Sequence, residues 1–127
     1  MIVKNESENI RNCLNSVKKI VDEIIITDTG SNDDTVAVCR EFTNAVYTYK
    51  WTDDFSAARN YGLSKAAYEW ILVMDADERL NLSDLQESAF RDTVNSTAAD
   101  VWGYYFDRIN RSKEHNGIPE WADNVTR

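Results

Sequence analysis

The chain has 127 residues, a formal net charge of −8 and a hydrophobic content of 43%. This length fits one domain with a core of moderate size. The negative charge argues against binding to nucleic acids and to anionic membrane surfaces, because no block of basic residues offsets it. An anionic substrate would need a cation or a few well-placed Arg and Lys side chains beside it.

Two cysteines, Cys13 and Cys39, are too few and too far apart in sequence for a zinc site or a disulfide framework. We expect both to be buried free thiols. The N-terminus lacks the apolar stretch of a signal peptide, and no apolar run is long enough to span a membrane. These features predict a soluble protein of the cytoplasmic type without a transmembrane segment.

Strand and helix patterns alternate from the start of the chain. A short apolar strand at residues 2–4 leads into a capping sequence at residues 5–8, which predicts a helix. Residues 23–28 include three consecutive isoleucines, a pattern typical of a strand covered on both faces. The apolar stripe of the intervening helix has helical spacing. It consists of Ile10, Cys13, Leu14 and Val17.

The alternation continues to the end of the chain. Capping residues at 29–34 predict a second helix, followed by a strand at residues 45–49, a helix from about residue 55 to 66 and a strand at residues 70–74. A fourth helix begins at the capping box of Ser83, and residues 101–109 indicate a strand rich in aromatics. This order predicts an α/β fold with an open, mostly parallel sheet and flanking helices.

An acidic cluster, residues 75–78, follows the predicted strand at residues 70–74. In open α/β sheets, ligands bind at the carboxyl ends of the strands. Carboxylates there are costly to desolvate without a cation, and Mg²⁺ or Mn²⁺ takes such oxygen ligands together with substrate phosphates. A solvated turn in which Asp75 and Asp77 cap the following backbone fits the same residues. The cluster alone does not separate these interpretations.

Two other positions have ligand-binding chemistry. Asp28 ends a predicted strand and is followed by Gly30, which permits a tight turn, so its carboxylate is placed to accept hydrogen bonds from a base or ribose. Arg59 lies in the second turn of the third predicted helix, within reach of a phosphate. Ordinary turn chemistry at Asp28 and a solvated surface position for Arg59 are the competing interpretations.

The spacing of these motifs resembles that of the bacterial family 2 glycosyltransferases, which adopt the GT-A fold. The resemblance covers almost the whole chain. It runs from the opening strand with Asn5 and Glu6 through residues 23–35 and ends on the Asp-x-Asp signature at residues 75–78. Residues 54–60 look especially like the branch that includes enzymes that glycosylate peptides.

The resemblance implies a nucleotide-sugar donor, usually a UDP-sugar, and Mn²⁺ or Mg²⁺ as cofactor. Glu6 and Asp28 would contact the nucleoside, and Arg59 would lie near the nucleotide or its phosphates. Asp75 and Asp77 would hold the metal, with Asp77 as the direct ligand. The donor-binding residues implied are Asn5, Glu6, Asp28, Arg59 and Asp75.

Members of this family continue into an acceptor-binding portion whose carboxylate base deprotonates the acceptor for transfer with inversion. Nothing in residues 110–127 matches that portion. We therefore expect residues 1–109 to form the nucleotide-sugar-binding GT-A core and residues 110–127 to form a loop. The chain is then a truncated one whose catalytic base lies beyond Arg127. The sugar stays open, and the acceptor is a peptide, a saccharide or a lipid-linked group.

Three alternatives compete with a complete transferase. A phosphatase of the haloacid-dehalogenase type also uses Asp-x-Asp, but on its first strand and with Thr or Val where this chain has Arg79. A receiver-type signalling domain would need an acidic pair after the first strand and a Lys after the last. The strongest alternative is a truncated nucleotide-sugar-binding module without efficient turnover.

Overall fold

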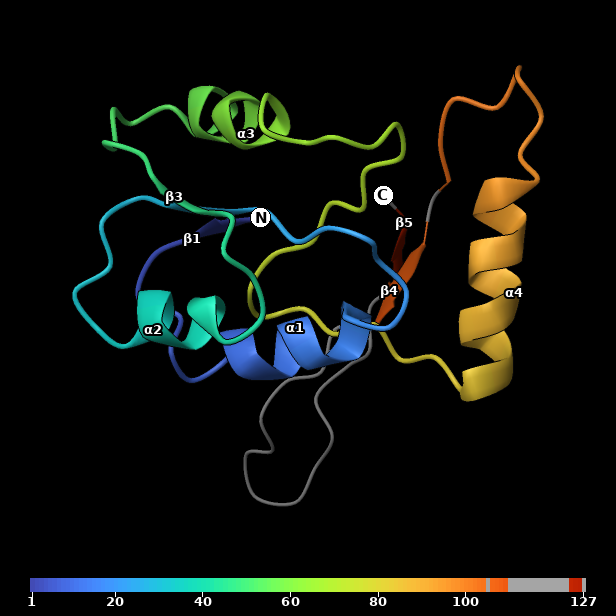
Figure 1. The fold of residues 1–127 in the computed structure, drawn as a ribbon, viewed down its shortest axis with the longest axis horizontal. Coiled ribbons are helices and arrows are strands. Elements are labelled where there is room, and N and C mark those ends of the chain that lie inside the picture. Colours follow the sequence, from blue (N-terminus) through green and yellow to red (C-terminus); the bar gives the residue numbers. More distant parts are fainter. Residues whose placement is uncertain (105, 110–123, 127) are drawn as a thin grey trace. The chain divides into compact units, whose positions relative to one another are not determined.

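The computed structural model describes residues 1–104, 106–109 and 124–126 (Figure 1). The chain divides into two compact units, Met1–Ser96 and Thr97–Arg127, and each is described by itself. In the described residues, no helix is both long and apolar enough to cross a membrane.

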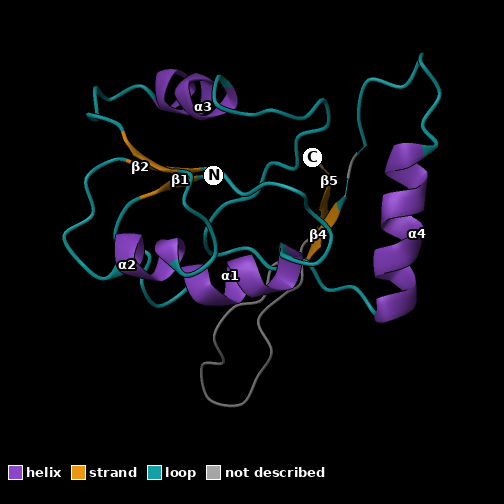
Figure 2. Ribbon diagram, in the orientation of Figure 1, coloured by secondary structure: helices purple, strands orange, loops and turns teal. Residues whose placement is uncertain are grey.

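The first unit is built on a parallel three-stranded sheet in the order β1-β2-β3 (Figure 2). The strands are β1 (Ile2–Val3), β2 (Ile26–Asp28) and β3 (Val46–Thr48). Val3 is in register with Asp28, and Asp28 with Thr48, so the carboxyl ends of all three strands lie at one edge. The predicted α/β fold with a parallel sheet is confirmed.

Helices cover both faces of this sheet. Helices α1 (Ile10–Val17) and α2 (Thr35–Arg40) lie on one side, and α3 (Phe55–Leu63) lies on the other (Figure 1). Helix α4 (Asp84–Asn95) begins with the predicted capping box at Ser83. Helices α1 and α2 are the crossover connections that parallel strands require, and both bury side chains in the core, whereas α4 has no buried residue.

The hydrophobic core lies between β1, β2 and the two helices α1 and α2. The predicted stripe of α1 is buried, and both thiols are free and buried, as expected. Ala76, from the acidic cluster, also belongs to this core. Its burial anchors residues 75–78 to the same core that supports the sheet. The buried cluster comprises Val3, Ile10, Leu14, Ile26, Cys39 and Ala76.

The predicted strand at residues 70–74 is wrong, because this segment forms no strand. Its apolar run indicated a strand covered on both faces, yet Ile71 is 43% exposed and Val73 is 54% exposed. A strand requires a ladder of backbone hydrogen bonds to a neighbour as well as an apolar sequence. The acidic cluster therefore follows a segment without regular secondary structure rather than a strand of the sheet.

In the second unit, the strand predicted at residues 101–109 is shorter than expected. Residues 101–104 and 106 form no strand, since Gly103 weakens strand formation and Trp102 is 96% exposed. The strand there is only β4 (Asp107–Ile109), which pairs antiparallel with β5 (Asn124–Thr126). β5 falls in the segment predicted to be a loop, and its three residues are too few to form a readable pattern. The division into residues 1–109 and 110–127 stays a prediction.

Candidate functional site

The carboxyl edge of the sheet has unusual backbone geometry in all three loops that follow the strands. Asn5 after β1 has φ 55°, Gly30 after β2 has φ 105°, and Asp53 after β3 has φ 56°. Side chains other than glycine rarely adopt this left-handed region, although Asn and Asp tolerate it best. Such geometry concentrates where backbone must turn sharply around a ligand or a functional group.

Asp28 closes the turn that follows its own strand. The side chain is almost completely buried, and its carboxylate accepts hydrogen bonds from the backbone N–H groups of Gly30 at 3.2 Å and Ser31 at 3.1 Å. The turn chemistry considered for Asp28 is therefore present. A carboxylate has about four acceptor positions, so these two donors leave capacity for a ligand N–H or hydroxyl group.

Asn5 and Glu6 meet the loop that follows β2. The Asn5 backbone N–H donates to Ser31 Oγ at 2.9 Å, and Asn5 Oδ1 accepts from the Asn32 N–H at 2.8 Å. The Glu6 N–H donates to Thr35 Oγ1 at 2.7 Å. The structure thus brings Asn5, Glu6 and the turn of Asp28 together, although they are more than twenty residues apart in sequence.

Asp33 organises this cluster and was missed by the sequence reasoning. One carboxylate oxygen accepts the Ser7 N–H at 3.1 Å, and the other accepts the Thr35 N–H at 3.0 Å and the Thr35 hydroxyl at 2.5 Å. The hydrogen bond from the Thr35 side chain is the main reason that the pKa of Asp33 lies well below its usual range. The Asp-x-Thr spacing before α2 is the signal that indicates such a turn.

A second group joins α3 to the acidic cluster. Arg59 Nη2 lies 3.7 Å from Asp75 Oδ1, and both side chains are about half exposed. Arg59 was predicted to lie near phosphates, and here its partner is a carboxylate. An exposed pair of this kind contributes little to folding stability.

The backbone around Asp75 is fixed on two sides. The Cys13 thiol of α1 donates to the Asp75 carbonyl oxygen at 3.4 Å. The Asp75 N–H donates to Glu78 Oε2 at 2.9 Å, and the Glu78 N–H donates back to the Asp75 carbonyl at 3.1 Å. Residues 75–78 are therefore a closed turn held against α1, and the carboxylate that caps it belongs to Glu78 rather than to Asp75 or Asp77.

Asp75 and Asp77 are the residues of this turn that were predicted to hold a metal. Among the residues that the structure describes, no group of three or more His, Cys, Asp or Glu side chains could enclose an ion. Asp77 is exposed and Asp75 is half exposed. Mg²⁺ is commonly held by one or two carboxylates plus substrate phosphates and waters, and Asp75 and Asp77 are the side chains of this turn that could take that role.

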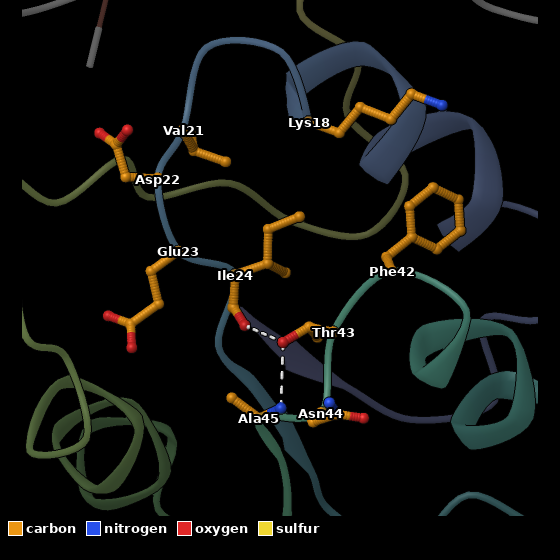
Figure 3. A pocket seen from close by; sticks show the side chains of 9 residues that line it. All are labelled: Lys18, Val21, Asp22, Glu23, Ile24, Phe42, Thr43, Asn44 and Ala45. Atoms are coloured by element: carbon orange, nitrogen blue, oxygen red, sulfur yellow. Dashed lines mark hydrogen bonds between the residues drawn. The ribbon is translucent and has the colours of Figure 1, made fainter.

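A separate hollow of about 400 Å³ lies at the opposite edge, where β2 and β3 begin (Figure 3). Its side chains serve the fold. Thr43 Oγ1 donates to the Ile24 carbonyl at 2.8 Å and accepts the Ala45 N–H at 3.0 Å, while the Lys18 ammonium lies over the Phe42 ring. Ligands of open α/β sheets bind at the carboxyl ends of the strands, so we place the candidate site there instead.

The arrangement of sheet and helices defines the class of protein. The chain has the GT-A glycosyltransferase fold, as shown by the structure titled "Crystal structure of S. aureus TarS 1-349". The two superpose with a TM-score of 0.55 over 70% of this chain and 29% of that one. Their sequences are 23% identical, so this likeness concerns the fold alone.

The family follows from the sequence. The pattern that defines "Glycosyl transferase family 2" matches residues 1–122, and the chain belongs to this family. It is 51% identical over 82 residues to a TPR repeat-containing protein of Synechococcus elongatus, a match that covers 65% of this chain and 20% of that protein. It is 48% identical over 79 residues to the SPbeta prophage-derived glycosyltransferase SunS of Bacillus subtilis, covering 61% of this chain and 19% of SunS.

An uncharacterized glycosyltransferase of Rickettsia felis is 39% identical over 87 residues, which cover 68% of this chain and 30% of that protein. The matched part of the chain spans between about a fifth and a third of the length of these three relatives.

Proposed function

We propose that this chain binds the UDP-sugar donor of a glycosyltransferase, with Mn²⁺ or Mg²⁺ as cofactor, and that the sugar passes to an acceptor with inversion. The observation that carries the proposal is the pairing of Arg59 with Asp75 on a turn that the core holds in place. A diphosphate needs positive charge beside it, and a metal needs carboxylate oxygens. The turn supplies the carboxylates and α3 supplies Arg59 beside them, in a protein whose net charge is −8.

Each residue has a role in the proposal. Asp75 and Asp77 hold the metal, which when bound neutralises charge on the diphosphate leaving group. Arg59 contacts the phosphates and orients them. Asp28 uses its remaining acceptor positions for the base or ribose, with Asn5 and Glu6 shaping the adjacent loop. The cytoplasmic location is likewise a proposal that rests on the sequence.

The proposal assigns neither the acceptor site nor the catalytic base to a described residue of this chain. We propose that the base comes from beyond Arg127, as the resemblance implies. The second candidate function is a nucleotide-sugar-binding module without efficient turnover. The pairing of Arg59 with Asp75, which supports donor binding, fits this candidate equally well. Under both candidate functions, we expect residues 1–127 to transfer sugar from UDP-sugars slowly or not at all. Efficient transfer would show that the base is within the chain.

Titration calorimetry with UDP tests the binding proposal. We expect binding in the presence of Mn²⁺ or Mg²⁺, loss of most affinity on adding EDTA, and weaker binding by Asp77→Ala. Asp92→Ala is the matched control, since Asp92 is an exposed acid on α4. Binding that ignores EDTA, or equal affinity of the Asp77 and Asp92 variants, would overturn the metal site. Absence of any UDP binding would overturn the proposed function.

A further inference from the structure

An aromatic pair, Trp51 and Phe55, lies where the loop after β3 enters α3. The ring centroids are 4.7 Å apart and the ring planes meet at 71°, an edge-to-face arrangement. Phe55 is 71% exposed, whereas Trp51 is partly buried. A ring as exposed as Phe55 adds little to the core, so packing does not account for its place.

Two adjacent acids hold the pair in position. Asp53 accepts the indole N–H of Trp51 at 2.9 Å while its own backbone is in the left-handed region. Asp54 caps α3 by accepting the Ala57 N–H at 3.0 Å, which fixes the helix end that carries Phe55. Asp is one of the few residues that adopt this left-handed geometry at low cost, so Asp53 can turn the chain sharply and still reach the indole N–H of Trp51.

The pair belongs to the candidate site by its place in the fold. The Tyr49 N–H donates to the Asp28 carbonyl at 2.8 Å, and Trp51 follows two residues later. The loop after β3 lies at the same edge of the sheet as the loops after β1 and β2 (Figure 1). The exposed ring of Phe55 therefore lies on the helix that directly follows this loop, and the loop begins at the Tyr49 hydrogen bond to the Asp28 carbonyl.

We propose that Phe55 is the stacking surface for the nucleobase of the donor and that Trp51 positions it. This inference rests on the proposed function and names a specificity determinant within it. A planar base matches a planar exposed ring, and stacking of bases on aromatic side chains is a common source of affinity. Asp53 and Asp54 repel phosphates from this spot, so it takes the uncharged end of the nucleotide.

The test compares two ligands that share the diphosphate but differ in the base. Titration calorimetry with Mn²⁺ measures the affinity for UDP and for inorganic pyrophosphate. We expect Phe55→Leu to weaken UDP binding by about tenfold, which is typical of one lost base–aromatic stack, and to leave pyrophosphate binding unchanged. Phe55→Tyr keeps the ring and retains UDP affinity. Tyr68→Leu is the control for loss of an exposed ring, since Tyr68 is 57% exposed outside the three loops of the site.

The role of Trp51 has its own readout. UDP is expected to quench tryptophan fluorescence in the wild-type chain, and pyrophosphate is not, because only the base approaches the pair. Trp51→Phe is expected to remove most of this quenching and to weaken UDP binding less than Phe55→Leu does.

Each contrary result has a distinct meaning. If Phe55→Leu binds UDP as tightly as the wild-type chain, the stacking site is wrong while the proposed function stands. If that variant loses UDP and pyrophosphate affinity equally, Phe55 supports the loop and does not contact the base, which also overturns the inference. If the wild-type chain binds neither ligand with metal, the proposed function fails and the stacking site fails with it.

Discussion

Gly62 of α3 lies directly against the side chain of Thr27 in β2. A Cβ at position 62 would stand 2.6 Å from Thr27 Oγ1, well inside the normal contact distance. Thr27 is fully buried, and this hydroxyl has no hydrogen-bond partner among the residues that the structure describes. The absence of a side chain at Gly62 lets α3, which carries both Arg59 and Phe55, approach the sheet closely.

Substitution of Gly62 by Ala is therefore expected to destabilise the fold by about 1–3 kcal/mol, the usual cost of forcing an extra carbon into a packed contact. Urea denaturation measures the free energy of unfolding. Gly103→Ala is the control, because no atom of the described residues lies within 4 Å of the added carbon. The double variant Thr27→Ala with Gly62→Ala is expected to recover part of the loss, and purely additive effects would contradict the contact.

Replacement of Arg59 by Gln separates stability from ligand binding. The pair with Asp75 is half exposed, so we expect the free energy of unfolding to change by less than about 1 kcal/mol. Loss of a charged contact to phosphate is expected to lower the affinity for UDP with Mn²⁺ by about tenfold. Arg91→Gln is the matched control, because Arg91 pairs with Asp22 at 2.8 Å on the surface of the same unit. Equal UDP affinity of the two variants would remove Arg59 from the site.

Asp33 gives the fold a defined pH dependence. Its folded pKa lies below the ordinary value of 3.8, chiefly through the Thr35 hydrogen bond. The ionised carboxylate therefore stabilises the fold fully above pH 3.8, and this contribution is lost as the pH falls below that value toward the folded pKa. We expect Asp33→Asn to be less stable than the wild-type chain at pH 7, with the difference shrinking below pH 4. Urea midpoints across this range measure it.

Asp34→Asn is the control for this pH series. Asp34 occupies the N-cap position of α2, but its side chain makes no capping hydrogen bond. The variant is expected to follow the wild-type curve. A pH-independent gap between Asp33→Asn and the wild-type chain would show that the carboxylate charge is not the source of the stabilisation.

The two thiols are expected to resist alkylation. Burial raises the pKa of Cys13 to about 12 and that of Cys39 to about 11, so the reactive thiolate is scarce at pH 8. Mass spectrometry after treatment with iodoacetamide should show little modification of the folded chain and two modifications in urea. Rapid labelling of Cys13 under native conditions would mean that the turn at Asp75 opens readily.

The sequence predicted the regular part of the first unit well, for identifiable reasons. The three isoleucines before Thr27 and the capping box at Ser83 are local signals, and local signals depend on the backbone of a few neighbouring residues. The confirmed parallel sheet and the buried stripe of α1 rest on such signals. The resemblance to family 2 glycosyltransferases, confirmed by the match over residues 1–122, rests on four motifs in their order.

What the sequence could not supply are contacts between distant residues. The run at residues 70–74 has strand composition, but whether a neighbour pairs with it is decided elsewhere in the chain. Asp33 was read as part of a turn, and its bond to Ser7 spans 26 residues. The partner of Arg59 likewise depends on how α3 and residues 75–78 meet, which no local pattern encodes.

The left-handed backbone at Asn5, Gly30 and Asp53 also limits how this edge of the sheet can be varied. Only Gly, Asn and Asp enter that region at low cost, so roughly three residue types are tolerated at each of these positions. A saturation library of the loops at the carboxyl edge of the sheet should therefore keep these three residues and randomise the positions between them. Ligand specificity can then be varied through the loop side chains, while the turns that fix the direction of each loop are retained.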